Sequence, residues 1–280
     1  MKKLLVTGCN GQLGRAVNRE YEGEQVQIIN TDVPQLDITD LDAVMRLVRE
    51  QKPDVIMNCG AMTAVDLCES EYEKAFRINA LGARNLSIAA RETGAKLFQI
   101  STDYVFSGDG KRAYVETDLP DPQSVYGSTK LAGEQFVRDF AGRYFIIRTA
   151  WLYGEGKNFV ATMLRLAQSN DTVRVVGDQV GTPTSAVQLA KMIHVLEPTE
   201  NYGIFHGTCE GQCSWADFAV EIFRQAGKNT KVEYITTEEF HAAAKRPAFS
   251  VLDNQMLRLT TDFEMQQWQD ALSVYLKEIL

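Results

Sequence analysis

The segment GCNGQLG at residues 8–14 constrains the fold of this chain more than any other stretch of the sequence. It places Gly8, Gly11 and Gly14 three residues apart, directly after an apolar run and before a segment with helical spacing of apolar residues. Glycines in this position allow a tight turn and let a pyrophosphate approach the N–H groups at the positive end of a helix. The spacing is G-x-x-G-x-x-G and not the standard G-x-G-x-x-G, so a purely structural turn is the alternative interpretation.

Apolar runs alternate with helical segments through the first half of the chain. The runs are rich in Val and Ile, as buried parallel strands are, and they cover residues 4–8, 26–30, 54–59, 95–101 and 144–150. The segments between them have helical spacing and cover residues 13–21, 41–50, 71–93 and 126–140. This alternation predicts an α/β fold with a doubly wound, Rossmann-like parallel sheet.

The second half of the chain has a looser rhythm. Its predicted helices cover residues 158–169, 185–196, 214–226 and 262–279, and loops that contain Gly and Pro separate them. We expect residues 1–150 to form an NAD(P)-binding Rossmann domain. We expect residues 151–280 to form mainly a smaller C-terminal substrate-binding lobe, part of which returns to the Rossmann sheet.

Composition excludes several classes of partner. The net charge is −8 and there is no long basic run, which argues against nucleic acid. No segment approaches the roughly 20 apolar residues that cross a bilayer, and the N-terminus lacks the apolar core of a signal peptide. We therefore expect a cytoplasmic protein without a membrane partner.

The cysteines do not indicate disulfides or a metal site. There are five of them, with no C-x-x-C pair, so free thiols are expected. His206, Cys209 and Cys213 are close in sequence, but a fourth ligand and the usual spacing of a zinc site are missing. We expect no bound metal.

The end of the second apolar run bears on the choice of cofactor. Asp32 can accept hydrogen bonds from an adenosine ribose 2′-OH and would repel a 2′-phosphate, which favours NADH. Arg15, directly after Gly14, could reach such a phosphate, which favours NADPH. Both cofactors stay open. Asp37 and Ile38 are candidates for adenine contacts, although an N-cap role fits this stretch equally well.

Two segments place a lysine four residues after a tyrosine, YGSTK at 126–130 and YGEGK at 153–157. Tyr126 opens a segment compatible with a helix, in which residues four apart share a face, so Lys130 is expected beside it. Tyr153 is followed by glycines that favour an irregular loop, so Lys157 need not face it. Only in the first pair does a predicted helix fix the tyrosine and the lysine on the same face.

The first pair suits the reduction of a ketone. A phenol holds its proton at neutral pH, and a nearby ammonium makes it a stronger donor to the oxygen that gains charge when hydride arrives. Thr102 lies at the carboxyl end of the predicted strand at 95–101, where open α/β sheets bind ligands. Its hydroxyl could bond the same oxygen, although Ser-Thr-Asp is also an ordinary exit from a strand.

These motifs together resemble known enzymes. GCNGQLG, STDYVF at 101–106 and YGSTKLAGE at 126–134, in this order, resemble the extended short-chain dehydrogenase/reductases. The segments that are similar to the dTDP-4-dehydrorhamnose reductases are DVIMNCGAMTAVDLCES, RTAWLYG, GDQVGTPT and RPAFSVLD. The resemblance covers nearly the whole chain. It implies NADPH- or NADH-dependent reduction of the C4 ketone of the nucleotide sugar dTDP-4-dehydro-L-rhamnose to dTDP-L-rhamnose.

The resemblance also implies roles for single residues. Tyr126 would donate the proton, and Lys130 would tune it and hold the nicotinamide ribose. Thr102, Asp103 and Trp151 would meet the sugar, and Thr102 would also assist catalysis. The implied cofactor contacts, besides Tyr126 and Lys130, are Gly11, Gln12, Leu13, Asp32, Asp37, Ile38, Ala61, Met62 and Thr63, and the glycine turn adds Gly8 and Gly14.

Three alternatives follow from departures or gaps in this pattern. A nucleotide-sugar epimerase or dehydratase would share the fold, but Tyr104 stands where a dehydratase is expected to carry a glutamate. A cofactor-binding regulatory subunit would not need Thr102, Tyr126 and Lys130 together. Some relatives carry a glutamate on the first helix for a Mg²⁺-linked dimer, whereas Arg15 stands in that stretch here. A metal-bridged dimer is not expected, and the sequence does not decide between a monomer and a homodimer.

Overall fold

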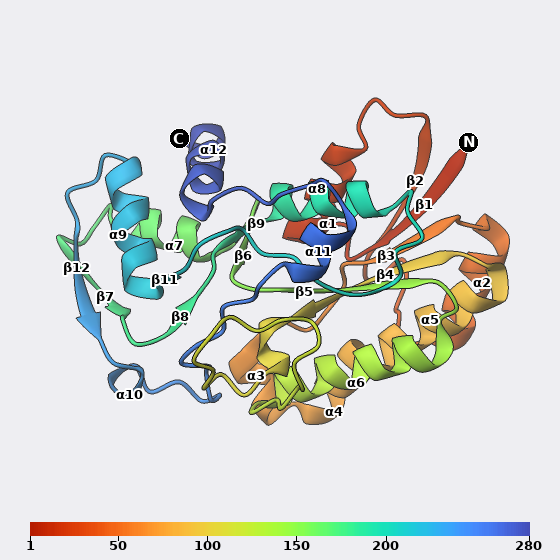
Figure 1. Cartoon of the computed structure of the whole chain (residues 1–280), viewed down its shortest axis with the longest axis horizontal. Helices are drawn as coiled ribbons and strands as arrows, with labels where there is room; N and C mark the ends of the chain where they lie inside the picture. The colour runs from red at the N-terminus through yellow and green to blue at the C-terminus, as the bar shows by residue number, and fades with distance from the viewer.

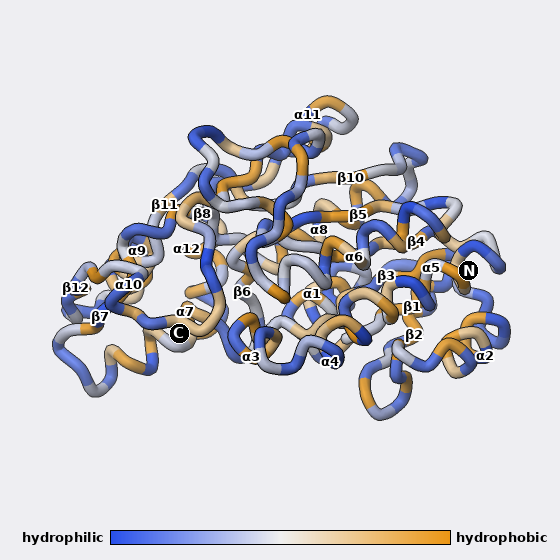
Figure 2. Tube along the Cα trace, turned by 90° about the horizontal axis from the view of Figure 1, so that it is seen from below, coloured by the Kyte–Doolittle hydropathy of each residue, from blue (hydrophilic) through white to orange (hydrophobic).

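A six-stranded parallel sheet forms the centre of the molecule. The structure is a computed structural model that describes residues 1–280. The strands, in their order across the sheet, are β10 (Gly203–His206), β5 (Tyr144–Thr149), β4 (Lys96–Thr102), β3 (Val55–Asn58), β1 (Lys2–Thr7) and β2 (Val26–Thr31). Every neighbouring pair is parallel, and Figure 2 shows the strands side by side in this order. The predicted doubly wound α/β sheet is confirmed.

Alternating strand residues build two cores, one on each face of the sheet. Leu4 and Val6 face α1 (Gln12–Glu20) and α8 (Ala186–Leu196). Leu5, between them in sequence, faces the opposite layer, because successive side chains of a strand point to opposite faces. That layer consists of α2 (Leu41–Gln51), α5 (Gly82–Thr93) and α6 (Val125–Phe140), and Figure 1 shows the two layers on either side of the sheet.

The helical segment predicted over residues 71–93 contains a π-helical turn. It consists of α4 (Tyr72–Phe76), the π turn η1 (Arg77–Leu81) and α5, and the short helix α3 (Val65–Ser70) precedes it. The turn carries Asn79, whose buried side chain accepts from the Met62 N–H at 2.8 Å and donates to the Met62 carbonyl at 3.1 Å. Single π turns are frequent at functional sites, and this one fixes the chain where it leaves β3.

A second lobe with its own core lies beside the sheet. Its principal elements are α7 (Phe159–Leu166), β7 (Thr172–Val176), α9 (Trp215–Gln225), β12 (Lys231–Ile235) and α12 (Trp268–Ile279). The core includes Val160, Phe218 and Leu272, each fully buried. Figure 1 shows α7, α9, β7 and β12 together at one end of the molecule, away from β1 and β2. The division at residue 150 into a cofactor domain and a substrate lobe stays a proposal.

The remaining elements are short. They are η2 (Asp103–Val105), β6 (Leu152–Tyr153), β8 (Val180–Gly181), β9 (Thr184–Ser185), β11 (Cys213–Ser214), α10 (Thr237–Phe240) and α11 (Gln255–Thr260). None of the helices is both long and apolar enough to cross a membrane.

The last predicted helix begins later than the sequence indicated. We expected it to cover residues 262–279, but α12 starts at Trp268. The preceding residues are extended because their backbone pairs with Glu210, which donates to the Gln266 carbonyl and accepts from the Trp268 N–H. Met265 is also buried in the main core, a long-range contact that outweighs helical spacing.

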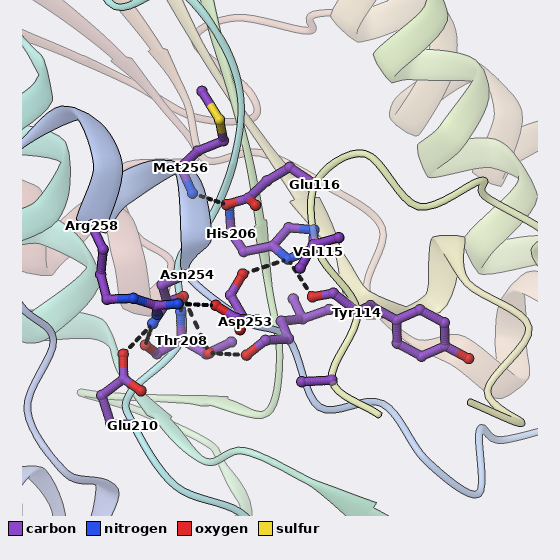
Figure 3. A network of polar contacts seen from close by, with 12 residues as sticks. Tyr114, Val115, Glu116, His206, Thr208, Glu210, Asp253, Asn254, Met256 and Arg258 are labelled. Carbon is purple, nitrogen blue, oxygen red and sulfur yellow. Dashed lines mark hydrogen bonds and ion pairs between the residues drawn. The ribbon is translucent and has the colours of Figure 1, made fainter. Parts of the chain in front are cut away.

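A buried polar seam joins three distant segments, and Figure 3 shows it from close by. We use this name for Tyr114, Glu116, His206, Asp253 and Asn254. The Glu116 carboxylate accepts from the His206 N–H at 3.0 Å, and His206 Nδ1 lies 3.1 Å from the carbonyl oxygens of both Tyr114 and Asp253. Burial lowers the pKa of His206 to about 3, so the ring is neutral and Nδ1 carries its proton. The seam fixes the chain after β4 against β10 and the segment that leads into α11.

Candidate active site

A cavity of about 680 Å³ opens at the carboxyl ends of the central strands. This is where parallel α/β sheets bind ligands, because the loops that leave the strands meet there. Residues of both lobes line the cavity. The predicted site residues among them are Gly11, Gln12, Leu13, Ala61, Thr63, Thr102, Asp103, Tyr126, Lys130 and Trp151.

A second cavity, of about 440 Å³, lies next to the first. The predicted residues that line it are Gly8, Asp32, Asp37, Ile38 and Ala61. Gly60 and Ala61 line both cavities, so the two form one elongated site that follows the ends of β1, β2 and β3 toward β4. An elongated site of this kind matches the shape of a dinucleotide.

Two predicted cofactor residues line neither cavity. Gly14 packs with its Cα against the glycine turn, where a Cβ would come within 2.4 Å of the Gly8 carbonyl oxygen. Met62 is buried, its backbone is bonded to Asn79, and its side chain packs with Tyr126. Both residues therefore lie behind the residues that line the cavities and support them.

The glycine turn is built for close approach. Gly8 has φ of +63°, and a Cβ there would lie 2.7 Å from the backbone of Gly60. The first turn of α1 has no side-chain cap at Gly11, which leaves its N–H groups open to an anion. Gln12 Oε1 is buried without a hydrogen-bond partner in a residue that lines the cavity. The tight turn and the open N–H groups fit the pyrophosphate of a nicotinamide dinucleotide, whereas the Gln12 oxygen can accept only from a donor such as a ribose hydroxyl.

Asp32 and Arg15, which favoured different cofactors, have different surroundings. The Asp32 carboxylate accepts from the N–H groups of Asn10 at 3.2 Å and Val33 at 2.9 Å and faces the second cavity. Arg15 pairs with Glu155 at 2.5 Å and donates from Nε to the Asn10 carbonyl. Glu155, a residue of the second lobe, also pairs with Arg19 at 2.5 Å. Its carboxylate therefore binds two arginines of α1.

Tyr126 and Lys130 lie in the first turns of α6. The Ser124 hydroxyl caps this helix by accepting from the Gly127 N–H at 3.1 Å. Both side chains are buried and line the large cavity, as the helical spacing indicated. Lys130 Nζ donates to the Ile100 carbonyl at 2.6 Å, which fixes the ammonium at the end of β4.

Burial dominates the electrostatics of this pair. It raises the pKa of Tyr126, and a hydrogen bond with Thr102 opposes the rise. It lowers the pKa of Lys130 to about 8, against the attraction of the buried Glu134 carboxylate. Tyr126 therefore holds its proton at neutral pH while Lys130 is still mostly an ammonium. The phenol is in the state that a proton donor needs.

Thr102 and Asp103 follow β4 into the cavity. The Thr102 hydroxyl donates to Asp103 Oδ1 at 2.9 Å and accepts from the Tyr104 N–H at 3.2 Å. Burial raises the pKa of Asp103 to about 6. Hydrogen bonds from the Ser250 and Thr102 hydroxyls oppose this rise and hold the carboxylate at the end of β4 beside the cavity.

Trp151 contributes an aromatic wall from the second lobe. Its ring stacks on Trp215 with centroids 3.6 Å apart and an interplanar angle of 11°. Its backbone has φ of 47°, a left-handed conformation that non-glycine residues rarely adopt. Both indoles line the cavity, so the strained turn places an apolar surface opposite α6.

Sequence reasoning missed several lining residues, among them Thr149, Lys157, Trp215 and Arg246. Thr149 ends β5 as Thr102 ends β4, and its hydroxyl is buried without a partner. That position at a strand end was the signal that could have found it. Arg246 Nε is also buried and unpartnered. Together with Gln12, three lining residues therefore have a buried polar atom with no hydrogen-bond partner.

The second tyrosine–lysine pair is separated, as expected. Tyr153 lies in β6, is 1% exposed and packs against Phe218 and Tyr275 in the core of the second lobe. Lys157 is exposed on the following loop and lines the large cavity, which Tyr153 does not. No three or more His, Cys, Asp and Glu side chains come together as a possible metal site, and all five cysteines are free.

Comparison with known proteins extends over the whole chain. The family model for the RmlD substrate binding domain matches residues 1–280. The spore coat polysaccharide biosynthesis protein SpsK of Bacillus subtilis (strain 168) is 39% identical over 99% of this chain and 98% of its own length. The crystal structure of a dTDP-4-dehydrorhamnose reductase from Clostridium acetobutylicum has a TM-score of 0.98 and 52% identity, and the match covers 99% of each chain. The reductase of Bacillus anthracis in complex with NADP has a TM-score of 0.97 and 44% identity, over 99% of this chain and 100% of the other.

Proposed function

The chain belongs to the dTDP-4-dehydrorhamnose reductase family, and we propose that it reduces the C4 ketone of dTDP-4-dehydro-L-rhamnose to dTDP-L-rhamnose with NADPH or NADH. The observation that carries the proposal is the arrangement of Thr102, Tyr126 and Lys130 in one cavity that continues into the glycine turn. The family supplies the substrate, and the cavity supplies the groups that a ketone reduction needs. A cytoplasmic location remains part of the same proposal.

The protein's own groups handle the ketone oxygen. When bound, the reduced nicotinamide supplies the hydride that adds to C4 of the sugar. Tyr126 then donates its phenolic proton to the C4 oxygen as charge develops there, so that an alcohol forms. Thr102 bonds the same oxygen, and the Lys130 ammonium stabilises the phenolate that remains. The raised pKa of Tyr126 keeps the proton available until this step.

The elongated site has a place for each part of the cofactor. The open N-terminus of α1 would bind the pyrophosphate, and the Gln12 oxygen could accept from a ribose hydroxyl. Asp32 would bind the adenosine ribose, and Asp37 with Ile38 would border the adenine, because all three line the smaller cavity. Lys130 would hold the nicotinamide ribose. NADP in the Bacillus anthracis reductase supports NADPH as a cofactor, and Asp32 supports NADH, so both belong in the test.

The alternatives have less support from the site. The glutamate expected of a dehydratase is absent, since Tyr104 stands in its place and packs edge-on against Tyr126 with ring centroids 5.4 Å apart. Burying a lysine costs free energy, and a regulatory subunit without turnover has no chemical need for a buried Tyr126 and Lys130 that line a ligand cavity.

Turnover tests the proposal directly. Purified protein, mixed with enzymatically prepared dTDP-4-dehydro-L-rhamnose, should oxidise NADPH or NADH, as measured by the loss of absorbance of the reduced nicotinamide. Mass spectrometry of the sugar should show a gain of two hydrogens. Cofactor binding without any oxidation would support the regulatory subunit, and release of water from a dTDP-hexose would support the dehydratase.

A further inference from the structure

A single carboxylate ties the second lobe to the helix that follows β3. Asp66, in α3, accepts from the Ala244 N–H at 3.0 Å with Oδ1 and from Arg246 Nη2 at 2.7 Å with Oδ2. These residues are about 180 positions apart in the chain. The segment continues over Gly108, whose carbonyl accepts from the Phe249 N–H at 2.8 Å. Residues 244–249 therefore cross from one lobe to the other beside the cavity.

Arg246 lies on the cavity side of this crossing. It lines the large cavity together with Tyr104 and Tyr126, and 23% of its side chain is exposed. Its Nε is buried without a hydrogen-bond partner, although a guanidinium has five N–H donors. The ion pair with Asp66 thus leaves part of the hydrogen-bonding capacity of a cavity-lining guanidinium unused.

The charges around the cavity favour an anion at this position. Arg15 pairs with Glu155, Lys130 donates to the Ile100 carbonyl, and Lys157 lies on the exposed loop that follows β6. Arg246 is the lining cation that stands beside the two tyrosines, and its only acidic partner, Asp66, is 47% exposed and does not line the cavity. Guanidinium groups bind phosphate oxygens with two parallel hydrogen bonds, and the substrate proposed above carries a diphosphate.

We propose that Asp66 and Arg246 form an exchangeable bridge, in which a phosphate oxygen of the nucleotide sugar replaces Asp66 as the partner of the Arg246 guanidinium. Asp66 is then a positioning residue: it keeps the Arg246 side chain extended over the cavity before the substrate arrives. Its bond to the Ala244 N–H holds the segment in place after the guanidinium turns to the ligand. The inference rests on the proposed function for the identity of the ligand, a nucleoside diphosphate.

Exchange is possible because Asp66, the acidic partner of the bridge, is about half exposed. Ion pairs at the surface contribute little, since water solvates both partners when they separate. A diphosphate carries more charge than a carboxylate and offers the guanidinium more acceptor oxygens. The state bridged to Asp66 and the state bound to phosphate therefore differ by a small free energy. A ligand that binds one of them more tightly shifts the population toward that state.

Calorimetric titration with dTDP, and with thymidine as the ligand without a diphosphate, tests the bridge without turnover. Arg246→Met should weaken dTDP binding by about tenfold to a hundredfold, as expected for a charged hydrogen bond, and leave thymidine binding unchanged. Arg246→Lys should restore part of the affinity. Lys245→Met is the matched control, because Lys245 donates to Gln123 and does not line the cavity.

Asp66→Asn distinguishes exchange from a static support. The asparagine keeps an oxygen for the Ala244 N–H but loses the charge that competes with phosphate, so dTDP should bind about two- to fivefold more tightly. Weaker dTDP binding in Asp66→Asn, or unchanged dTDP binding in Arg246→Met, would overturn the bridge. The proposed function is judged separately by turnover of the wild-type protein: dTDP binding that follows these signs without any sugar reduction would contradict the function and retain the bridge.

Discussion

The segments YGSTK and YGEGK share three of their five residues and lie within 30 positions of each other, yet they are built into different parts of the molecule. In the first, Tyr126 and Lys130 are on α6 and both side chains line the cavity. In the second, Tyr153 is in the core of the second lobe, whereas Lys157 is on the surface of a loop. The spacing of two side chains has a fixed meaning only where a helix imposes it.

The glycine after each tyrosine also serves a different contact. A Cβ at Gly127 would lie 2.1 Å from the Tyr104 carbonyl oxygen, so glycine lets α6 approach the end of β4. This approach brings Tyr126 to Thr102. A Cβ at Gly154 would lie 2.8 Å from the Ala186 side chain, so that glycine lets a loop pack on α8. One glycine places a catalytic candidate, and the other supports a core.

The largest expected effect separates the two tyrosines. Tyr126→Phe should lower kcat by about 10²–10⁴-fold, the usual contribution of a positioned general acid, with little change in cofactor affinity. Tyr153→Phe removes the same hydroxyl from the other segment and should keep kcat near the wild-type value. Steady-state kinetics with both variants checks this. Equal losses, or a Tyr126→Phe enzyme that retains most of its kcat, would show that the helix was the wrong criterion.

The two lysines should differ by a smaller factor. Lys130→Met removes a buried ammonium that we assign to both the phenol and the nicotinamide ribose, so kcat and cofactor affinity should each fall by about tenfold to a hundredfold. Lys157→Met removes the same charge from the exposed loop and should cost less in both. Kinetics and fluorescence titration with NADPH measure the two quantities. If Lys130→Met changes only one of them, the double role is wrong.

The sequence predicted the sheet better than the edges of its helices. The buried parallel strands and the glycine turn were recognisable because each depends on local residues: apolar runs in the strands, and Gly8 at positive φ in the turn. The start of α12 was not, because Glu210, far away in the chain, pairs with the preceding residues, and one of those residues, Met265, is buried in the main core. α3 and the π turn around Asn79 also depend on such distant contacts.

The candidate site divides in the same way. Motifs pointed to Thr102, Tyr126 and Lys130, which the structure brings into one cavity. They gave no reason to choose Trp215 or Arg246, because those residues reach the site only through the packing of the second lobe. Trp215 follows the capping residue Ser214 at the start of α9, an ordinary helix start, and nothing local indicates that its ring meets Trp151.

The pH dependence of stability should report the burial of Lys130. Its pKa is lowered to about 8 in the folded protein, whereas the unfolded chain has the ordinary value near 10.4. Between these values the unfolded state binds more protons, so this group's contribution to the free energy of unfolding rises as the pH increases; below about pH 8 both states are protonated and the cost of burial is fully present.

Urea unfolding of the wild-type protein and Lys130→Met at several pH values isolates this contribution. The wild-type protein should gain stability relative to the variant from about pH 8 to pH 10, the interval between the two pKa values. The control is the same comparison between the wild-type protein and Lys157→Met, since the Lys157 side chain is exposed. A relative gain of equal size in the control pair would mean that burial of Lys130 is not its source.

The smallest effect concerns the stability of the core around Tyr153. Its hydroxyl is buried without a hydrogen-bond partner, so Tyr153→Phe removes a polar group that is already unsatisfied and keeps the ring contacts with Phe218 and Tyr275. The free energy of unfolding should stay the same or rise by up to about 1 kcal/mol.

Tyr275→Phe is the matched control, because the Tyr275 hydroxyl donates to the Gly154 carbonyl at 2.8 Å and accepts from Asn158 Nδ2 at 2.9 Å. That variant should lose about 1 kcal/mol or more in urea unfolding. A larger loss in Tyr153→Phe than in Tyr275→Phe would mean that the Tyr153 hydroxyl has a hydrogen-bond partner. The hydroxyl of this tyrosine, and not its ring alone, would then stabilise the second lobe.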